Sequence, residues 1–455
     1  MRLLLFANSL LAYSITAATS SSIAPRDNIT DNVLGITADD YPDGTSSPSS
    51  VHSAHRRANS LRKREILQYD PSEEELPTAI VRMDVSRRGP HYITKVAFGE
   101  KLFSLVIDIE TPATWIARTG FRCFEPRLLS ELPPQDCRLG RLFKPDSSSS
   151  SFNLPGPQFS VHSINGQNLL GDPGSVSLGL GGLHRGEKTI TFTQIVGAIT
   201  KGYWPGDGKS SGSLGLAYYS KRGMLSGSHV YRSVLENIFG DENVPAIFSL
   251  ALDGGTGGDL GIGGIPRIPI DDDSPWVQTA LIPSGLDEAP TYDIMIDGFD
   301  ITPHPRSSSG SAGNRYIPWP QITKLRTNTG FLHLPDKVVS YIADLFDPPA
   351  VPSPRSENIY IVPCRAKAPR VGIKISSTSY YISPQDLIQP IDVRKPNDKC
   401  QLMIQKAGNG KPALGGAWLN NVLAVFDLRD SVDHERPERN GYRSGRMWFV
   451  GREKT

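Results

Sequence analysis

One stretch decides how the rest of the chain is interpreted, Leu105-Val-Ile-Asp108-Ile109-Glu110-Thr-Pro-Ala-Thr114-Trp115. Its apolar start runs directly into an acidic residue, Asp108, which a short loop separates from Trp115. Two strand-like runs lead into this loop, His91–Phe98 and Lys101–Ile107, and the tight connection between them is typical of a β-hairpin. We therefore expect Asp108 to stand where an apolar strand meets a loop.

Similar short strand-like runs continue along the body of the chain from Ile80 onward. With 43 Gly and 37 Pro in 455 residues, the composition favours many turns and argues against a helical bundle. Two segments, Tyr231–Phe239 and Asp336–Phe346, have apolar residues spaced as in an amphipathic helix. The other strand candidates are Phe159–Ile164, Ser175–Leu180, Thr189–Val196, Ile247–Leu252, Tyr292–Ile296, Ile359–Val362, Val371–Ile375, Val422–Leu428 and Met447–Val450. The sequence predicts a mainly β protein with two lobes, 80–265 and 275–455.

The charge balance and the histidine pattern exclude several function classes. Lys and Arg together number 48 and Asp and Glu 47, a formal net charge of +1, so no nucleic acid partner is implied. The nine histidines are scattered and form no His-Glu-x-x-His pair, so we expect no metal site and no cofactor. We also expect no membrane span and a monomer.

The N-terminal region reads as targeting and processing sequence. A basic start, a short apolar run and small residues near Ala18 are typical of a secretory signal peptide, assigned to 1–19. Residues 20–64 are rich in Ser, Asp, Pro and Arg, which predicts a disordered, propeptide-like segment that ends in Arg62-Lys63-Arg64. Asn28 lies there in an N-glycosylation pattern. The mature protein is predicted to be secreted.

Four cysteines would oxidise in the secretory pathway. The sequence permits three pairings. We favour Cys123 with Cys137 and Cys364 with Cys400, because each of these pairs lies within one half of the chain.

Taken in order, several segments resemble the pepsin-like aspartic proteases (peptidase A1). The Asp108 loop is similar to that family's first active-site loop, Asp-Thr-Gly-Ser followed by Trp. Further matching segments are Phe159–Gly166 at the flap, Ser211–Ala217, Pro245–Leu250, Gly258–Gly264, Leu414–Leu419 and Val422–Leu428. The resemblance covers about Ile80 to Val450. It implies a bilobed fold with a cleft between two β-rich lobes.

The family's chemistry needs two carboxylates, one from each lobe, that share a proton and activate a water. Here Asp108 is kept, but the Thr-Gly after it is Ile109-Glu110. Counted back from Pro335, the second Asp-Thr-Gly falls on Arg326-Thr327-Asn328. The resemblance thus implies that Arg326 stands at the second catalytic position and that Thr327 lines the cleft beside it.

This arginine predicts a catalytically impaired site. No Asp or Glu lies between Trp319 and Pro335, so a small shift of register does not supply one. A guanidinium cannot act as acid or base, and beside Asp108 it would lower the carboxyl pKa by about 1–3 units. Glu110 is expected to face outward, or to pair with a basic neighbour such as Arg118, and not to replace the missing carboxylate.

The flap departs from the family pattern as well. The tyrosine that covers the substrate in the family falls on Ser163, with His162 beside it. We favour a secreted non-proteolytic homologue whose cleft binds an extended peptide or another ligand. Two alternatives stay open, an active aspartic-type endopeptidase at acid pH and an enzyme that acts on a small molecule.

Overall fold

The computed structural model describes fourteen stretches of the chain, and all of them fall within one compact unit, Asp70–Thr455. They are 77–86, 91–126, 130–145, 150–152, 158–162, 168–183, 186–218, 232–241, 243–282, 291–304, 314–354, 356–391, 399–429 and 445–453. The predicted signal peptide, the 20–64 segment with Asn28, and Ser163 lie outside these residues and stay predictions.

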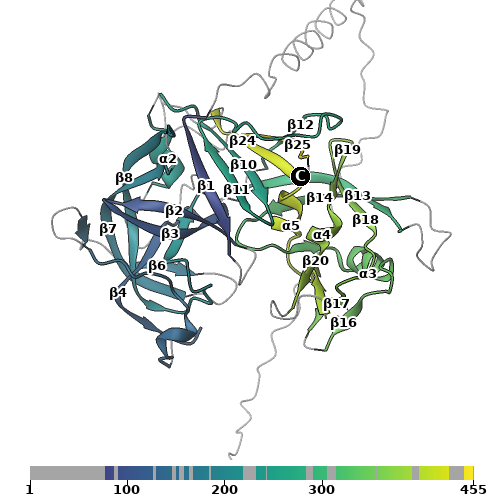
Figure 1. Cartoon of the computed structure of the whole chain (residues 1–455), viewed down its shortest axis with the longest axis horizontal. Coiled ribbons are helices and arrows are strands. Elements are labelled where there is room, and N and C mark those ends of the chain that lie inside the picture. Colours follow the sequence, from purple (N-terminus) through teal and green to yellow (C-terminus); the bar gives the residue numbers. More distant parts are fainter. Residues whose placement is uncertain are drawn as a thin grey trace, which may run out of the picture. The chain divides into compact units, whose positions relative to one another are not determined.

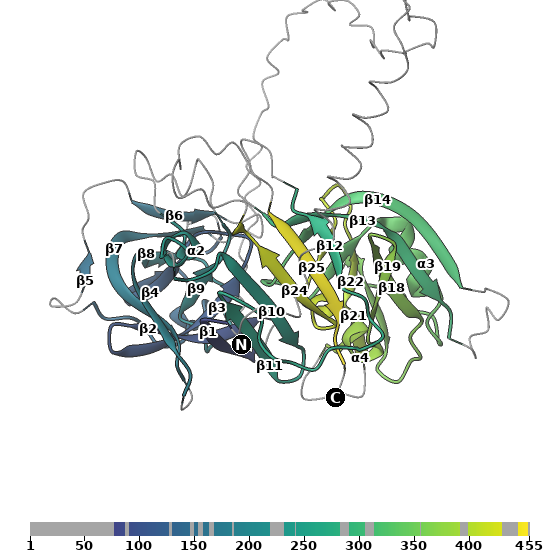
Figure 2. The ribbon, with the colours of Figure 1, turned by 90° about the horizontal axis from the view of Figure 1, so that it is seen from above.

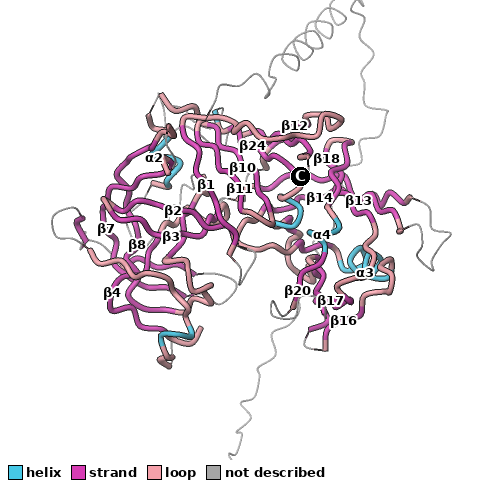
Figure 3. The backbone as a smooth tube through the Cα atoms, viewed as in Figure 1, coloured by secondary structure: helices cyan, strands magenta, loops and turns pink. Residues whose placement is uncertain are grey.

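Strands dominate the described structure, as Figure 3 shows, which confirms the mainly β class. The helical elements are short: η2 (Pro134–Asp136), α2 (Val234–Ile238), α3 (Asp336–Asp344), α4 (Pro384–Leu387) and α5 (Gly416–Leu419). The two predicted helices are present, although α2 begins three residues later than expected. The Ser233 hydroxyl and the Glu236 carboxylate form a reciprocal capping box that fixes its start.

The largest sheet has fourteen strands and contains the predicted β2–β3 hairpin, in which Phe98 pairs with Lys101. In sheet order the strands are β12 (Val277–Ala280), β25 (Arg446–Gly451), β24 (Val422–Asp427), β10 (Ile247–Asp253), β11 (Gly257–Ile262), β1 (Ala79–Val85), β2 (Tyr92–Phe98), β3 (Lys101–Asp108), β9 (Gly212–Gly215), β4 (Trp115–Cys123), β8 (Thr189–Gly202), β7 (Asn168–Gly181) and β5 (Ser150–Phe152), with β6 (Phe159–His162) paired to β7.

Two smaller sheets form the second half of the chain. The seven-stranded sheet runs β19 (Thr378–Ile382), β18 (Arg370–Ile375), β13 (Asp293–Thr302), β14 (Arg315–Leu325), β23 (Ala413–Leu414), β15 (Leu332–Leu334) and β22 (Ile404–Lys406). The four-stranded sheet runs β16 (Val351–Ser353), β17 (Ser356–Pro363), β21 (Lys399–Leu402) and β20 (Ile388–Pro390).

The last two strands join the sheet of the first half. β24 lies antiparallel to β10, with Ile247 opposite Asp427, and Figures 1 and 2 both show the two strands side by side. The rings of Phe248 on β10 and Phe426 on β24 stack with centroids 4.1 Å apart, and Tyr292 packs edge-on against Phe426. The two halves therefore share one continuous hydrophobic core.

Two disulfides tie down loops beside these sheets. Cys123 at the end of β4 bonds to Cys137, and Cys364 after β17 bonds to Cys400 on β21. Both predicted pairings are thereby confirmed. No helix in the described stretches is long and apolar enough to cross a membrane.

Candidate functional site

Asp108 stands at the end of β3, where the first of two similar loops begins. β3 pairs in parallel with β9, so that Asp108 lies opposite Gly215. The Leu216 N–H donates a hydrogen bond to the Asp108 backbone oxygen over 2.7 Å. A Cβ on Gly215 would lie 2.6 Å from the carbonyl carbon of Pro112, so only glycine lets the loop close against β9. The backbone thus holds the Asp108 loop in place.

The second loop is built in the same way at the end of β14. β14 pairs in parallel with β23, with Leu325 opposite Leu414, and the Arg326 N–H donates to the Leu414 oxygen over 3.0 Å. A Cβ on Gly415 would lie 2.3 Å from the Phe331 oxygen. Arg326 therefore comes directly after β14, much as Asp108 stands at the end of β3.

Thr327 connects the two loops directly. Its hydroxyl donates to the Ile107 oxygen over 2.9 Å and accepts the Ile109 N–H over 3.2 Å. The side chain is fully buried. These two bonds flank Asp108 on both sides, so the segment that begins at Arg326 lies against the loop that carries Asp108.

Arg326 forms an ion pair with Glu110 across this junction. Its Nε atom lies 2.8 Å from Glu110 Oε1, and the two side chains are only 16% and 10% exposed. Glu110 therefore does not face outward, and the basic residue with which it pairs is Arg326 and not Arg118, the example named from the sequence. Arg118 on β4 pairs with Asp172 on β7 at 3.1 Å, and β8 lies between these two strands in the sheet.

The Asp108 carboxylate accepts hydrogen bonds from its own loop. The Glu110 N–H donates to Oδ1 over 2.8 Å, and the Thr111 hydroxyl lies 3.4 Å from Oδ2. Burial, followed by the negative charge of Glu110, raises the pKa of Asp108 to about 7. The prediction that Arg326 lowers this pKa is wrong, since the Arg326 charge is paired with Glu110.

Glu110 is the second carboxyl at this junction. Burial raises its pKa above the usual range, although Arg326, Lys324 and Asn328 each favour its charged form. Its Oε2 atom is buried and has no hydrogen-bond partner among the described residues. Asp108 and Glu110 are therefore both shifted toward the protonated form.

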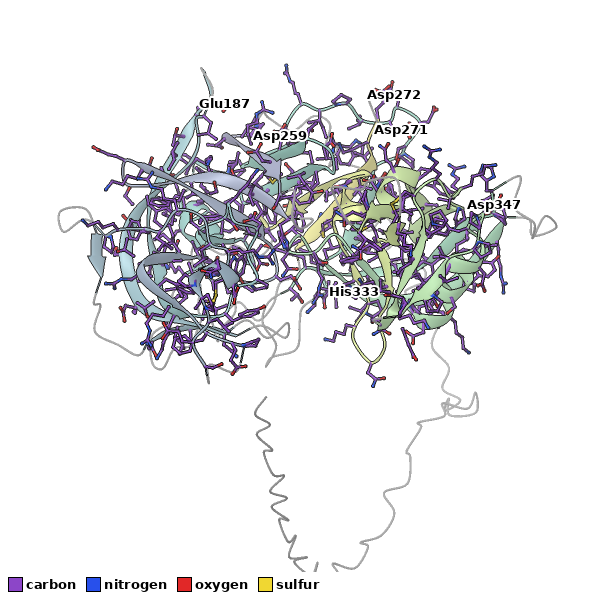
Figure 4. The ribbon with its side chains drawn as sticks, turned by 60° about the horizontal axis from the view of Figure 1, so that its bottom comes forward. Glu187, Asp259, Asp271, Asp272, His333 and Asp347 are labelled. Atoms are coloured by element: carbon purple, nitrogen blue, oxygen red, sulfur yellow. A yellow bond between two sulfur atoms is a disulfide. The ribbon has the colours of Figure 1, made fainter. Side chains whose placement is uncertain are left out.

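Two residues that sequence reasoning missed also surround the guanidinium. Burial and the positive charge of Arg326 lower the pKa of His333 on β15 to about 4, so this imidazole is neutral above that pH. Figure 4 shows His333 well apart from Glu187 and Asp259. Those two carboxylates pair with Arg82. Lys324 precedes Arg326 by two residues, and strand alternation, which places such residues on one face, was the available signal.

The flap residues contribute less to the described site. His162 ends β6, and Ser163 lies beyond the described residues, so their roles at the flap stay predictions. Within the described stretches, no three His, Cys, Asp or Glu side chains gather as metal ligands would.

The chemistry open to this arrangement depends on pH. Below about pH 7 the Asp108 carboxyl carries a proton and can donate it. The opposing loop offers a permanent cation, which cannot take up or release a proton near neutral pH. The segment 319–335, which contains that loop, has no Asp or Glu.

Comparison with known proteins agrees with the paired-loop geometry. The family model for eukaryotic aspartyl proteases matches residues 91–432. A protein of Aspergillus fumigatus named a probable aspartic-type endopeptidase is 28% identical over 358 residues, which cover 75% of this chain and 77% of that protein. The chain belongs to the eukaryotic aspartyl protease family and has its mainly β, bilobed, pepsin-like fold.

Proposed function

We propose that this protein is a secreted, non-proteolytic member of its family, whose interlobe groove binds an extended peptide. The observation that carries the proposal is the largely buried Arg326–Glu110 ion pair, 2.8 Å long, at the junction of the two loops. The loop of the second half supplies a guanidinium to this junction and no carboxylate. Fold and groove do not depend on catalytic residues, so binding survives their loss.

A guanidinium in place of the second catalytic carboxylate should greatly slow proteolysis. Positioned acid–base catalysis contributes about 10²–10⁴-fold for each function, and two carboxylates supply two functions in the family mechanism. With Asp108 protonated, a second group must act as the base that activates water. Glu110 belongs to the same loop as Asp108, and Arg326 holds one of its oxygens.

Cleavage of denatured protein tests the proposal. The mature chain is incubated at acid pH with denatured casein, with and without pepstatin, an inhibitor of aspartic proteases. We expect no cleavage above that of an Asp108→Asn variant prepared in parallel. Pepstatin-sensitive cleavage that Asp108→Asn abolishes would overturn the proposal.

An endopeptidase is the second candidate, and one observation favours it. The charge of Glu110 contributes to the raised pKa of Asp108, so two carboxyl groups interact as a proton-sharing pair does. The Aspergillus relative is named a probable endopeptidase. In that case Glu110→Gln would abolish cleavage as completely as Asp108→Asn.

Secretion is part of the proposal. The two disulfides support passage through an oxidising compartment. Expression of the full chain in a eukaryotic host, followed by N-terminal sequencing of protein from the medium, tests it. We expect a mature N-terminus after Arg64, and retention of the chain inside the cells would contradict secretion.

A further inference from the structure

The guanidinium of Arg326 is only partly used by its partner. Nε faces Glu110, and the side chain keeps 16% of its surface exposed. Nε is buried and makes no aligned hydrogen bond, whereas neither Nη nitrogen is among the buried unpaired atoms of the described stretches. A planar guanidinium presents such N–H groups as a fork that fits a carboxylate.

The charges around this fork favour an anion at acid pH. Arg326 and Lys324 are cations. Asp108, with a pKa of about 7, is mostly protonated at acid pH, and His333, with a pKa of about 4, is neutral above that pH. The Glu110 carboxylate compensates part of the charge of these two cations, and its raised pKa reduces that compensation at acid pH. The junction therefore carries surplus positive charge until Asp108 ionises.

We propose that the Nη edge of Arg326 binds a carboxylate of the bound peptide, so that the protein selects peptides with an acidic side chain or a free C-terminus. This inference rests on the proposed peptide-binding function and names its ligand class. A ligand carboxylate at this position would form charge-assisted hydrogen bonds with a partly buried guanidinium, where such bonds are stronger than at the surface.

Matched peptide sets separate the two sources of carboxylate. Each peptide of an arrayed library is made in three forms: a free C-terminus, an amidated C-terminus, and an amidated form with every Asp and Glu replaced by Asn and Gln. Binding of the full mature chain is measured at acid pH and again above pH 7. At acid pH we expect at least about tenfold tighter binding of one carboxylate form than of its neutral counterpart, and loss of this preference above pH 7.

Three variants test the assignment to Arg326. Arg326→Gln should remove the preference for carboxylates and keep the binding of neutral peptides. Glu110→Gln should strengthen carboxylate binding, because it frees the guanidinium from its competitor. Opposite effects at one ion pair cannot arise from simple unfolding. Arg118→Gln, at the Arg118–Asp172 pair on β4 and β7, is the control and should change nothing.

The outcomes separate this inference from the proposed function. If no peptide of any form is retained, the proposed function fails and the inference fails with it. If the three forms bind equally well, the inference alone is overturned. It is also overturned if a carboxylate preference persists in Arg326→Gln.

Discussion

The two loops at the centre of the molecule share one scaffold and differ in chemistry. Each follows a strand in parallel pairing, and each closes against a glycine that has no room for a side chain, Gly215 in one half and Gly415 in the other. At the ends of these strands the chain places Asp108 and Arg326. Backbone hydrogen bonds and small residues therefore build the site, and its chemistry can change without loss of the architecture.

The connection between the loops is also one-sided. Thr327 makes two hydrogen bonds into the opposite loop, whereas Ile109, which follows Asp108 as Thr327 follows Arg326, is fully buried and has no hydroxyl to return them. The Arg326–Glu110 ion pair is a second link between the loops and takes the place of the hydrogen bonds that Ile109 cannot make. Four sets of substitutions test this difference between the loops.

The largest expected effect comes from restoring the family's loops. The variant with Ile109→Thr, Glu110→Gly and Arg326→Asp gives both loops a carboxylate and a hydroxyl. We expect peptide cleavage at acid pH to rise by at least about 10²-fold over wild type, because a shared-proton pair becomes available. Pepstatin-sensitive hydrolysis of casein is the measurement. The same variant with Asp108→Asn is the control, and a folded but inactive restored variant would contradict the alignment of the loops.

Breaking the ion pair should have the next largest effect. Arg326→Leu leaves the Glu110 carboxylate buried without its cation, which costs about 3–5 kcal/mol of unfolding free energy. Urea unfolding above pH 7 is the measurement. Arg122→Leu is the control, since the Arg122–Glu131 pair is 60% and 48% exposed and should change the unfolding free energy little. Equal losses in the two variants would mean that burial gives the Arg326 pair no special role.

The Asp108 carboxyl should make stability depend on pH. Its pKa is about 7 in the folded protein, raised from 3.8, so the native state holds the proton more tightly than the unfolded chain. Unfolding free energy therefore falls as pH rises from about 4 to 7, by roughly 2–4 kcal/mol, and the penalty is fully present above pH 7. Asp108→Asn should flatten this slope in urea unfolding across that range. Parallel slopes would show that another group is responsible.

Loss of the Thr327 hydroxyl should have the smallest effect. Thr327→Val keeps the shape of the side chain and leaves the Ile109 N–H and the Ile107 oxygen unpaired, at a cost of about 1–3 kcal/mol in unfolding free energy. Thr200→Val removes one hydrogen bond, to Leu170 within the first half, and should cost about 0.5–1.5 kcal/mol. A Thr327→Val variant as stable as wild type would show that this bridge adds little.

Much of the fold could be predicted from the sequence because its signals are local. Alternation of apolar residues marked the β2–β3 hairpin, and apolar spacing marked α3 after Pro335. The late start of α2 was also predictable, from the Ser233-x-x-Glu236 pattern of a capping box. The family resemblance, counted back from Pro335, implied Arg326-Thr327 as the counterpart of the Asp108 loop.

The charge pairing at the site was not predictable in the same way. Asp108 and Glu110 lie two residues apart in one loop, so the sequence does not say which of them contacts Arg326. The directions of the side chains in the structure pair Arg326 with Glu110. Burial, followed by the charge of Glu110, raises the pKa of Asp108, whereas the sequence predicted that this pKa would be lowered. His333 was missed because β15 has only three residues, too few to show a period.

The position of β24 and β25 has a consequence for biosynthesis. β10 cannot complete its pairing until β24 has left the ribosome near the end of translation, because Ile247 pairs with Asp427. β24 in turn pairs with β25, which is translated later still. Until then one edge of β10 offers unpaired N–H and C=O groups to any neighbouring strand. Pairings so distant in sequence form slowly. The nascent polypeptide is thus most vulnerable to aggregation at its middle, and chaperone binding to β10 would protect it there.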